Sequence, residues 1–485
     1  MNTVSKKIFN FLLKKQIKHV FGYSGGAILP ILNELNNDIN KLEFIKNSTE
    51  QCSGFAAEGY SKSLNKNKPG VIVTTSGPGV TNLITPLQDA YNDGIPLIAI
   101  TGQVPTDAIG TDAFQECNAI ELTNACTKWN KILKEDDNIE NVLNLAYNIS
   151  MEDRKGPVHI DIPKNVMNLK ISDNNKTKEI MNYKNIYINN KIINSIIYKI
   201  NKSKKPIIIA GQGCNNCSIE LSHFAKNNLI PVTTTLHGVG CFDENNYLSL
   251  EWLGMHGNPV ANKAVQQSDL IIAIGTRFDD RTTGNLRKYG LNAINNHGII
   301  HIDSSIEQIT KVKKLFNKYY DTDKMYLPVY SDSIHFFKRF NNIIFDKTDN
   351  DWLEEIKDLK EEYNYEYNEC NIKLKGPDVI KSINKYLDYM KIKNNTFITT
   401  GVGNHQMWTA QHIKWEFPNK LITSGSLGTM GVGVPFAIGA KLANPSSIVI
   451  CIDGDSSFNM TSNELQTILE NNIPIKIFIL NDNRQ

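Results

Sequence analysis

Long hydrophobic runs and an excess of charge of either sign are both missing from this sequence. No apolar stretch approaches the roughly 20 residues that a helix needs to cross a bilayer. Lys and Arg together number 52 and Asp and Glu 50, whereas nucleic-acid binders usually concentrate a strong basic excess. These absences argue against a membrane partner and against a nucleic-acid partner. The hydrophobic share of 41% is ordinary for a globular protein, so a buried core is expected.

Cysteine is sparse, and its eight copies are scattered along the chain. Only Cys214 and Cys217 stand in a C-x-x-C pair. A zinc site needs two further ligands at matching spacing, which the sequence does not offer, so we interpret the pair as incidental thiols. Scattered cysteines of this kind are typical of a reducing compartment.

The first residues look superficially like a basic targeting helix. However, Val4, Ile8 and Val20 mark one apolar face that leads directly into a glycine turn at Gly22, which is typical of the first helix of a domain. We therefore predict that the chain carries no targeting peptide and is cytoplasmic. The plastid stroma is the alternative if the gene is encoded in an organelle.

Strand-like runs alternate with helical stretches along the whole chain, which predicts an α/β fold. The length of 485 residues suits roughly three domains. We predict three doubly wound parallel-sheet domains, at residues 1–170, 186–345 and 375–485, with a polar linker, SDNNKTKEIMNYKN, after the first. A doubly wound sheet would be expected to continue beyond Gln485, so we expect the third domain to be C-terminally truncated.

The segment from Ile448 to Arg484 combines two apolar strands with two oxygen-rich turns. Gly454 allows a sharp turn after the first strand, so that Asp455 projects from the strand's carboxyl end. The second strand ends in a turn that contains Asp482. In a right-handed βαβ unit both strand ends lie on the same edge of the sheet, so the two carboxylates can converge on one small, hard cation. The alternative is an ordinary βαβ unit with a solvated aspartate.

This segment resembles the thiamin diphosphate motif, in which Gly-Asp is followed, after a helix and a strand, by an Asn-Asn turn. Two positions depart from that motif: Ser456 stands where glycine or alanine is usual, and Asp482 stands where asparagine is usual. Both residues keep small size or oxygen ligation. The resemblance implies that Asp455, Asp482 and the backbone carbonyl of Arg484 bind Mg²⁺.

Longer motifs extend the resemblance in a consistent order along the chain. They are YSGGAILP, NSTEQCSGFAAEGYSK, TSGPGVTNL and GTDAFQE in the first block, TTTLHGVG, LGMHG and GTRFDDRTTG in the second, and GNHQMWTAQ and TSGSLGTMGVGVPFAIGA in the third. Together they resemble the large catalytic subunit of acetolactate synthase (acetohydroxyacid synthase), a thiamin diphosphate enzyme. The resemblance covers nearly the whole chain. It implies a pyrimidine-binding domain, a central FAD-binding domain and a diphosphate-binding domain, in that order.

The resemblance implies a catalytic role for Glu50. In the family a glutamate at this position hydrogen-bonds the aminopyrimidine ring of thiamin diphosphate, and a carboxylate held there favours the imino tautomer that activates the cofactor. Without this context, Glu50 would be interpreted as a favourable charge at a helix N-terminus. By the same resemblance, Phe114, Gln115 and Lys164 line the substrate channel.

Further residues are implied to bind the cofactors. Gly428 accepts the exocyclic amino group of thiamin diphosphate through its carbonyl, and Met430 supports the bent cofactor, although an ordinary core methionine is the alternative. The other expected contacts with thiamin diphosphate are His405, Gln406, Gly454 and Ser456. Nucleotides bind at strand ends along one edge of open α/β sheets, and the residues expected to bind FAD are Gly211, Gly213, Met255, Arg277, Asp279 and Asp303.

The implied reaction is that of acetolactate synthase, a transferase that acts as a carboligase. Pyruvate is decarboxylated and condensed with a second 2-ketoacid in valine, leucine and isoleucine biosynthesis. A second pyruvate gives 2-acetolactate, and 2-ketobutyrate gives 2-aceto-2-hydroxybutyrate. The FAD would be structural or vestigial, as it is in the family, because the carboligation requires no hydride transfer. A homodimer or tetramer is expected, with a regulatory small subunit as a further partner.

Several departures from the family pattern keep two alternatives open. Ser48 and Thr49 replace an Arg-His pair before the glutamate, Cys52 replaces a glycine, and Gly401 and Asn404 replace an aspartate and a glutamine near the diphosphate. The first alternative is another thiamin diphosphate enzyme, such as a 2-ketoacid decarboxylase or a pyruvate oxidase. The second is a catalytically weakened subunit that binds cofactor or a partner.

Overall fold

The computed structural model describes residues 2–36, 42–171, 188–345, 350–363, 365 and 374–481. The chain divides into two compact units. The first unit comprises Met1–Asn182, Asn395–Gln406 and Ile422–Gln485, and the second comprises Tyr183–Asn394 and Met407–Leu421. The end of the sequence therefore folds back into the unit that the beginning of the sequence builds.

A six-stranded parallel sheet forms the N-terminal part of the first unit, with the strand order β3-β2-β4-β5-β7-β6. Its strands are β2 (His19–Gly22), β3 (Glu43–Lys46), β4 (Gly70–Thr74), β5 (Leu97–Gln103), β6 (Trp129–Ile132) and β7 (Pro157–Pro163). The helices around it are α1 (Val4–Lys14), α2 (Leu29–Asn36), α3 (Glu50–Ser63), α4 (Pro78–Thr81), α5 (Ile84–Asp93), α6 (Ala119–Asn124), α7 (Ile139–Met151) and α8 (Lys164–Met167). A short antiparallel pair, β1 (Asn2–Thr3) and β8 (Lys170–Ile171), ties the two ends of this part together.

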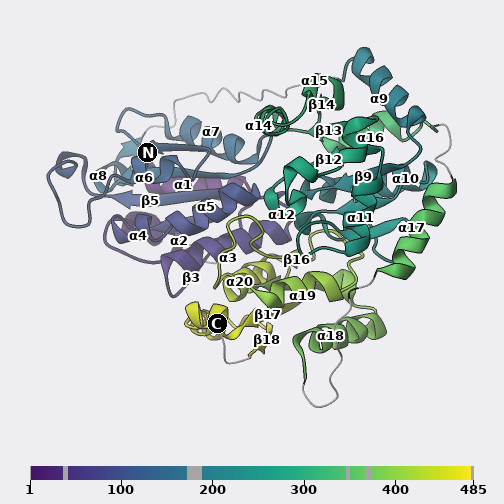
Figure 1. The fold of residues 1–485 in the computed structure, drawn as a ribbon. Coiled ribbons are helices and arrows are strands. Elements are labelled where there is room, and N and C mark those ends of the chain that lie inside the picture. Colours follow the sequence, from purple (N-terminus) through teal and green to yellow (C-terminus); the bar gives the residue numbers. More distant parts are fainter. Residues whose placement is uncertain are drawn as a thin grey trace. The chain divides into compact units, whose positions relative to one another are not determined.

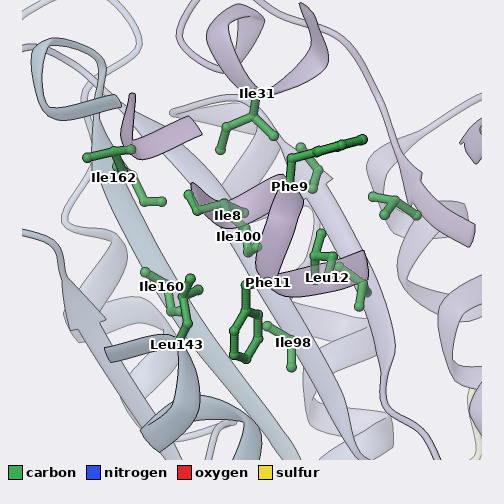
Figure 2. Close-up of a cluster of buried hydrophobic side chains, with 14 of the residues drawn as sticks. Ile8, Phe9, Phe11, Leu12, Ile31, Ile98, Ile100, Leu143, Ile160 and Ile162 are labelled. Atoms are coloured by element: carbon green, nitrogen blue, oxygen red, sulfur yellow. The ribbon is translucent and has the colours of Figure 1, made fainter. Parts of the chain in front are cut away.

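Helices α1, α2 and α7 bury their apolar faces in one core with β5 and β7, as Figure 2 shows. The spacing of Ile8 and Leu12 places both on one face of α1. Complete burial of such a side chain contributes about 1.5–3 kcal/mol to stability. The other core side chains labelled in the figure are Phe9, Phe11, Ile31, Ile98, Ile100, Leu143, Ile160 and Ile162.

A second sheet forms the C-terminal part of the first unit, with the strand order β16-β15-β17-β18. Its strands are β15 (Thr396–Thr400), β16 (Leu421–Ile422), β17 (Ile448–Gly454) and β18 (Lys476–Leu480), and β17 is parallel to both β15 and β18. The helices are α20 (Gly433–Ala443), α21 (Asp455–Met460) and α22 (Glu464–Glu470), and α19 (Asn404–His412) begins in this unit and belongs to the second unit from Met407 onward. The expected strands at the two ends of Ile448–Leu480 and the helix between them are present as β17, β18 and α22, but a further helix, α21, begins at Asp455 where a turn was expected.

Helices α3 and α20 lie side by side and join the two sheets of the first unit (Figure 1). Glycines allow this close approach, because a Cβ at Gly59 would clash with the backbone of Phe436 and one at Gly439 would clash with the backbone of Ala56. The rings of Phe55 and Phe436 pack edge to face, with their centroids 6.3 Å apart. This packing sets the position of α3 relative to the segment that precedes α20.

The second unit contains a six-stranded parallel sheet with the order β11-β10-β9-β12-β13-β14. Its strands are β9 (Pro206–Ala210), β10 (Val232–Thr234), β11 (Ser249–Trp252), β12 (Leu270–Ile274), β13 (Ile299–Asp303) and β14 (Tyr326–Tyr330). Its helices are α9 (Asn190–Lys202), α10 (Ser218–Asn227), α11 (Pro259–Gln267), α12 (Asp280–Thr283), α13 (Leu291–Asn295), α14 (Ile306–Phe316), α15 (Thr322–Met325), α16 (Ser333–Phe340), α17 (Asn350–Glu362) and α18 (Gly376–Met390).

Each of these three sheets has a point at which the strand order reverses. The reversal points lie between β2 and β4, between β9 and β12, and between β15 and β17. In open α/β sheets, ligands bind outside the carboxyl ends of the strands at such a point. The topology therefore marks three places where binding residues are expected.

The predicted fold class, α/β with parallel sheets, is confirmed. The expected linker at 172–185 lies outside the described residues, and so do Asp482 and Arg484. Within the described ranges, no helix combines the length and the apolar character that a membrane crossing requires.

Candidate functional site

Asp455 stands at the reversal point between β15 and β17. It is the first residue of α21, directly after β17, and its side chain is partly exposed. A carboxylate in this position suits Mg²⁺ as an oxygen ligand. The other two expected ligands, Asp482 and the carbonyl of Arg484, lie beyond Asn481, where the described part of the chain ends. The role of all three residues as magnesium ligands stays a prediction.

His405 packs against the same strand end. Its Nε2 lies 3.2 Å from Oδ1 of Asp453, and both side chains are buried. A Cβ at Gly403 would lie 3.0 Å from the imidazole, and one at Gly454 would lie 2.9 Å from it, so these positions favour glycine. The two strand ends therefore present backbone without side chains beside a histidine, which is a suitable setting for a diphosphate.

Gln406 is buried and holds a neighbouring segment. Its Nε2 donates hydrogen bonds to Oγ1 of Thr423 at 2.7 Å and to the carbonyl of Ser424 at 2.9 Å. The amide nitrogen of Gln406 thus positions the chain that leads to Gly428. Ser456 lies on α21 directly after Asp455 and is partly exposed.

Gly428 and Met430 lie on an open turn between β16 and α20. Gly428 has a φ of 75°, in the left-handed region that favours glycine, and a Cβ there would meet nothing within 4 Å. The side chain of Met430 is 36% exposed, so it is not an ordinary core methionine. An accessible turn next to an exposed thioether leaves room for a ring to pack against it, which fits the expected thiamin diphosphate.

Glu50 is the first residue of α3 and is partly exposed. Thr49 caps this helix, because its side chain accepts a hydrogen bond from the backbone N–H of Cys52 at 3.1 Å. Asn82 Nδ2 donates to Oε2 of Glu50 at 3.0 Å. The glutamate therefore stands on a capped helix with one carboxylate oxygen held in place.

The chain before α3 is tied to the C-terminal sheet of the same unit. The side chain of Asn47 and the backbone N–H of Ser48 each donate to the carboxylate of Glu464 at 2.7 Å. Glu464 is fully buried at the start of α22. The contacts of the described residues thus anchor the start of α3, although they do not join Glu50 to Asp455.

The three residues expected in the substrate channel are accessible. Phe114 is 89% exposed, and Lys164 is exposed as the first residue of α8. Gln115 has a φ of 62°, and a Cβ at Gly77 would lie 2.9 Å from its carbonyl oxygen. The backbone of Gln115 therefore packs against Gly77, where a larger residue would be too close. The strongly exposed ring of Phe114 directly precedes Gln115 in the chain.

A buried polar network behind this loop was missed by sequence reasoning. Gln103 Nε2 donates to the carbonyl of Cys117 at 3.0 Å and to Oδ2 of Asp161 at 2.9 Å. Thr101 donates to Oδ1 of Asp161 at 2.6 Å and lies 2.7 Å from Nε2 of His159. Burial raises the pKa of Asp161 to about 7 and lowers the pKa of His159 to about 3. The sequence signal that was available is the presence of polar residues at alternate positions of β5 and β7, two otherwise apolar strands.

In the second unit, two backbone segments approach each other closely at the reversal point between β9 and β12. A Cβ at Gly211 would clash with the carbonyl of Gly275, and one at Gly213 would lie 2.8 Å from the Cα of Gly275. Gly211 also donates its backbone N–H to the carbonyl of Ile274 at 2.8 Å. Small residues at this junction allow a nucleotide phosphate to approach the backbone.

Charged and apolar groups flank that junction. Asp279 caps α12 by accepting from the backbone N–H of Thr282 at 2.9 Å, and Arg277 lies 3.5 Å from Asp279. Asp303 ends β13. Met255 is 58% exposed. The exposed thioether of Met255 suits packing against the flavin ring, and the carboxylate of Asp303 suits hydrogen bonding to ribose hydroxyls. Both features fit the expected FAD.

The C-x-x-C pair is buried. Cys214 and Cys217 are at most 1% exposed, and Cys217 Sγ lies 3.5 Å from the carbonyl of Cys214. Within the part of the chain that the structure describes, neither residue belongs to a group of three or more side chains that could hold a metal. The pair therefore packs as small apolar side chains.

Comparison with known families matches a part of each of the three parallel sheets. Residues 2–122 match the thiamine pyrophosphate enzyme, N-terminal TPP binding domain. Residues 193–319 match the thiamine pyrophosphate enzyme, central domain. Residues 401–485 match the thiamine pyrophosphate enzyme, C-terminal TPP binding domain.

Known proteins extend these matches to nearly the whole chain. The mitochondrial acetolactate synthase catalytic subunit of Saccharomyces cerevisiae is 41% identical, over 99% of this chain and 71% of its own length. The acetolactate synthase large subunit of Lactococcus lactis is 36% identical, over 99% of this chain and 80% of its own length. A probable acetolactate synthase large subunit of Methanococcus aeolicus is 38% identical, over 97% of this chain and 78% of its own length.

The chain belongs to the acetolactate synthase family. This confirms the expected resemblance, the thiamin diphosphate-dependent carboligase activity and thiamin diphosphate as the cofactor. Mg²⁺ and FAD are typical of acetolactate synthases, and pyruvate is the substrate that membership implies. The relatives include mitochondrial and chloroplastic forms, so similarity alone does not assign a compartment.

Proposed function

We propose that this acetolactate synthase-family chain is a catalytic subunit that condenses pyruvate with a second 2-ketoacid. The products are 2-acetolactate from two pyruvates and 2-aceto-2-hydroxybutyrate from pyruvate and 2-ketobutyrate. The observation that carries the proposal is the placement of Glu50, a partly exposed carboxylate on a capped helix with Oε2 held by Asn82. This arrangement favours a proton-transferring glutamate over a catalytically weakened subunit.

Glu50 is assigned to proton transfer. Asn82 donates to Oε2, so Oε1 is the oxygen that we assign to hold and move a proton toward the cofactor's pyrimidine ring. When bound, thiamin diphosphate supplies an electron sink for the decarboxylation of pyruvate and a carbon nucleophile for the carboligation. The carbonyl of Gly428 and the side chain of Met430 would orient the cofactor.

The diphosphate end is assigned to the reversal point between β15 and β17. Asp455, together with the side chain of Asp482 and the carbonyl of Arg484, would hold Mg²⁺, and the ion would neutralise the diphosphate. His405, Gln406, Gly454 and Ser456 belong to the same proposed site. Phe114, Gln115 and Lys164 would line the approach of the 2-ketoacid, with the lysine supplying a positive charge for its carboxylate.

FAD is assigned to the middle sheet. Gly211, Gly213, Met255, Arg277, Asp279 and Asp303 would bind it, because they surround the reversal point between β9 and β12. The carboligation requires no hydride transfer, so the flavin would serve a structural role. We place the chain in the cytoplasm, or in the plastid stroma if its gene is organellar.

We propose that the active form is at least a homodimer, with a tetramer and a regulatory small subunit as further levels of assembly. Glu50 lies on α3 in the N-terminal part of the first unit and Asp455 on α21 in its C-terminal part, and no hydrogen bond or ion pair among the described residues joins them. A second copy of the chain would complete each site by bringing a Glu50 to an Asp455.

Product analysis tests the proposed reaction. The purified chain would be incubated with pyruvate, thiamin diphosphate, Mg²⁺ and FAD, with and without 2-ketobutyrate. Acetolactate, and acetohydroxybutyrate when 2-ketobutyrate is present, are the expected products. Acetaldehyde would indicate a decarboxylase and acetyl phosphate an oxidase. The absence of all these products with a folded, cofactor-loaded protein would favour the weakened subunit.

Mixing two inactive variants tests the shared site. Glu50→Gln and Asp455→Ala chains would be combined under conditions in which subunits exchange. Some activity should return, because one of the two sites in a mixed dimer would have an intact Glu50 and an intact Asp455. If mixed dimers form and no activity returns, each site is built within one chain.

A further inference from the structure

The turn that carries Gly428 is held from within by one hydroxyl. Ser424 Oγ accepts hydrogen bonds from the backbone N–H groups of Gly428 at 3.1 Å and Thr429 at 3.0 Å. The same hydroxyl donates to Oδ1 of Asp89 on α5 at 2.5 Å. Ser424 is 1% exposed, so water does not compete for these bonds. A single buried serine thus ties the turn to a helix of the other sheet.

Three more bonds connect this segment to α3 and α5. Thr429 Oγ1 donates to Oδ1 of Asp89 at 3.2 Å, and the backbone N–H of Gly425 lies 3.2 Å from Oδ2 of Asp93. Lys62 Nζ donates to the carbonyl of Thr423 at 2.7 Å. The segment from Thr423 to Thr429 is therefore fixed at several points by side chains of α3 and α5.

These anchors form a buried charge cluster. The ammonium of Lys62 lies 2.9 Å from Glu58 and 3.1 Å from Asp93, and 4.5 Å from the centre of the Phe436 ring. Glu58, Asp89 and Asp93 lie close enough together to hold a cation. The Lys62 ammonium pairs with Glu58 and Asp93 and interacts electrostatically with Asp89, so the cluster already contains a positive charge that the protein itself supplies.

The protonation of the cluster follows from its burial. Burial raises the pKa of Glu58 well above its usual range. Burial alone would lower the pKa of Lys62, but the carboxylates of Glu58, Asp93 and Asp89 outweigh it and raise that pKa. Lys62 therefore stays charged and keeps the carboxylate anchors of the turn in place.

We propose that Asp89, acting through Ser424, is a positioning residue that fixes the Gly428 turn for thiamin diphosphate. This rests on the proposed roles of Gly428 and Met430. The physical need is clear from the turn itself: Gly428 has a φ of 75°, and no neighbour lies within 4 Å of where its Cβ would be. A glycine in open space has large conformational freedom, so without the tether its carbonyl would sample many directions.

Ser424→Ala tests the tether in the protein without thiamin diphosphate. Hydrogen exchange of the Gly428 and Thr429 amides should accelerate at least tenfold, because both lose their acceptor. In the same variant, the half-saturating concentration of thiamin diphosphate with Mg²⁺ should rise about tenfold. Ser150→Ala is the matched control: Ser150 is a fully buried serine of α7 whose hydroxyl donates to the carbonyl of Tyr147 at 2.7 Å. It should leave exchange at the turn unchanged.

A pair of variants at Thr429 provides a second test of the tether if Ser424→Ala does not fold. Thr429→Ser keeps the hydroxyl that reaches Asp89, whereas Thr429→Val keeps the shape and loses it. Thr429 is only partly buried, so both variants should fold. Thr429→Ser should bind thiamin diphosphate within about twofold of the parent, and Thr429→Val should bind it several-fold more weakly and show faster exchange at the turn.

The outcomes separate this proposal from the proposed function. Unchanged exchange at Gly428 and Thr429 in Ser424→Ala, or faster exchange with unchanged affinity for thiamin diphosphate, overturns the positioning role. If Ser424→Ala does not fold, equal binding by the two Thr429 variants overturns it. A parent protein that binds thiamin diphosphate but forms no acetolactate would refute the proposed reaction, while the exchange and binding results would still decide the positioning role.

Discussion

The two proposed cofactor sites differ in how their polar groups are held. In the second unit, the acidic side chains are fixed within their own turns: Asp279 accepts from Thr282 and Asp303 from Ser305, each within three positions along the chain. In the first unit, the turn near Gly428 is fixed by Asp89, which is 335 positions from Ser424. One site is organised locally and the other by long-range contacts.

This difference has consequences for how each site responds to change. A local turn needs only its own few residues, so it forms whenever its strands form. The long-range contacts that fix the Gly428 turn exist only after α3 has packed against α20. They weaken when a residue far away in the sequence, such as Asp89, is altered. We therefore expect variants of the first unit to affect thiamin diphosphate while leaving FAD in place, and the reverse for variants of the second unit.

The largest expected effect is from Glu50→Gln in the first unit. Acetolactate formation from pyruvate at saturating cofactor should fall below a tenth of the parent, because the amide cannot move the proton. Thiamin diphosphate binding should stay within about tenfold, and bound FAD should not change. Glu121→Gln, at an exposed position of α6, is the matched control and should keep its activity. Activity above a tenth in Glu50→Gln would remove this residue from the mechanism.

Asp455→Ala should show the next largest effect. It removes a proposed ligand, so the half-saturating concentration of thiamin diphosphate with Mg²⁺ should rise at least tenfold in isothermal titration. Asp482→Asn should retain binding, because an amide oxygen still ligates magnesium. Asp332→Ala, which removes the cap of α16 in the second unit, should leave this binding unchanged. Equal loss in Asp455→Ala and Asp482→Asn would mean that Asp482 is needed for its charge.

The buried network at Asp161 should make the stability of the first unit depend on pH. Burial raises the pKa of this carboxyl from 3.8 to about 7, so folding favours the protonated form. The stability that it contributes is complete below about pH 4 and is lost as the pH rises through about 7. Between pH 5 and pH 8 the loss should be about 2–3 kcal/mol.

Denaturant unfolding at pH 5 and pH 8 measures this loss. Asp161→Asn should reduce the difference in the free energy of unfolding between pH 5 and pH 8 by this amount. Asp136→Asn, at an exposed position, should leave that difference unchanged. Because the other titrating groups are common to parent and variants, the comparison isolates Asp161. An equal pH dependence in the parent and in Asp161→Asn would show that this carboxyl is ionised in the folded protein.

Asp279→Ala in the second unit should have the smallest effect. Loss of the α12 cap should cost about 1 kcal/mol, and FAD should bind a few-fold more weakly. Flavin fluorescence titration measures the affinity. Thiamin diphosphate binding should stay unchanged, because the effect is confined to a local turn. A parallel loss of thiamin diphosphate affinity would break the distinction between a locally and a distantly organised site.

Much of the fold and part of the site follow from sequence patterns. The apolar run from Ile448 predicts β17, which the structure has, whereas the turn expected at Gly454 is the start of a helix, α21. The exposed position of Met430 also agrees with its expected role at a cofactor. The buried network around Asp161 and the anchors of Ser424 were not predicted, because no local periodicity marks which distant strand or helix a polar side chain will meet.

The sequence by itself determined the elements, the capped helix that starts at Glu50 and the local turns around Asp279 and Asp303. These depend on hydrogen bonds and torsional preferences within a few residues, which short patterns encode. Only the tertiary structure decided that Asn395–Gln406 and Ile422–Gln485 join the first unit and that Asp89 holds Ser424. Those contacts depend on which faces are buried against each other, and burial is a property of the whole packed chain.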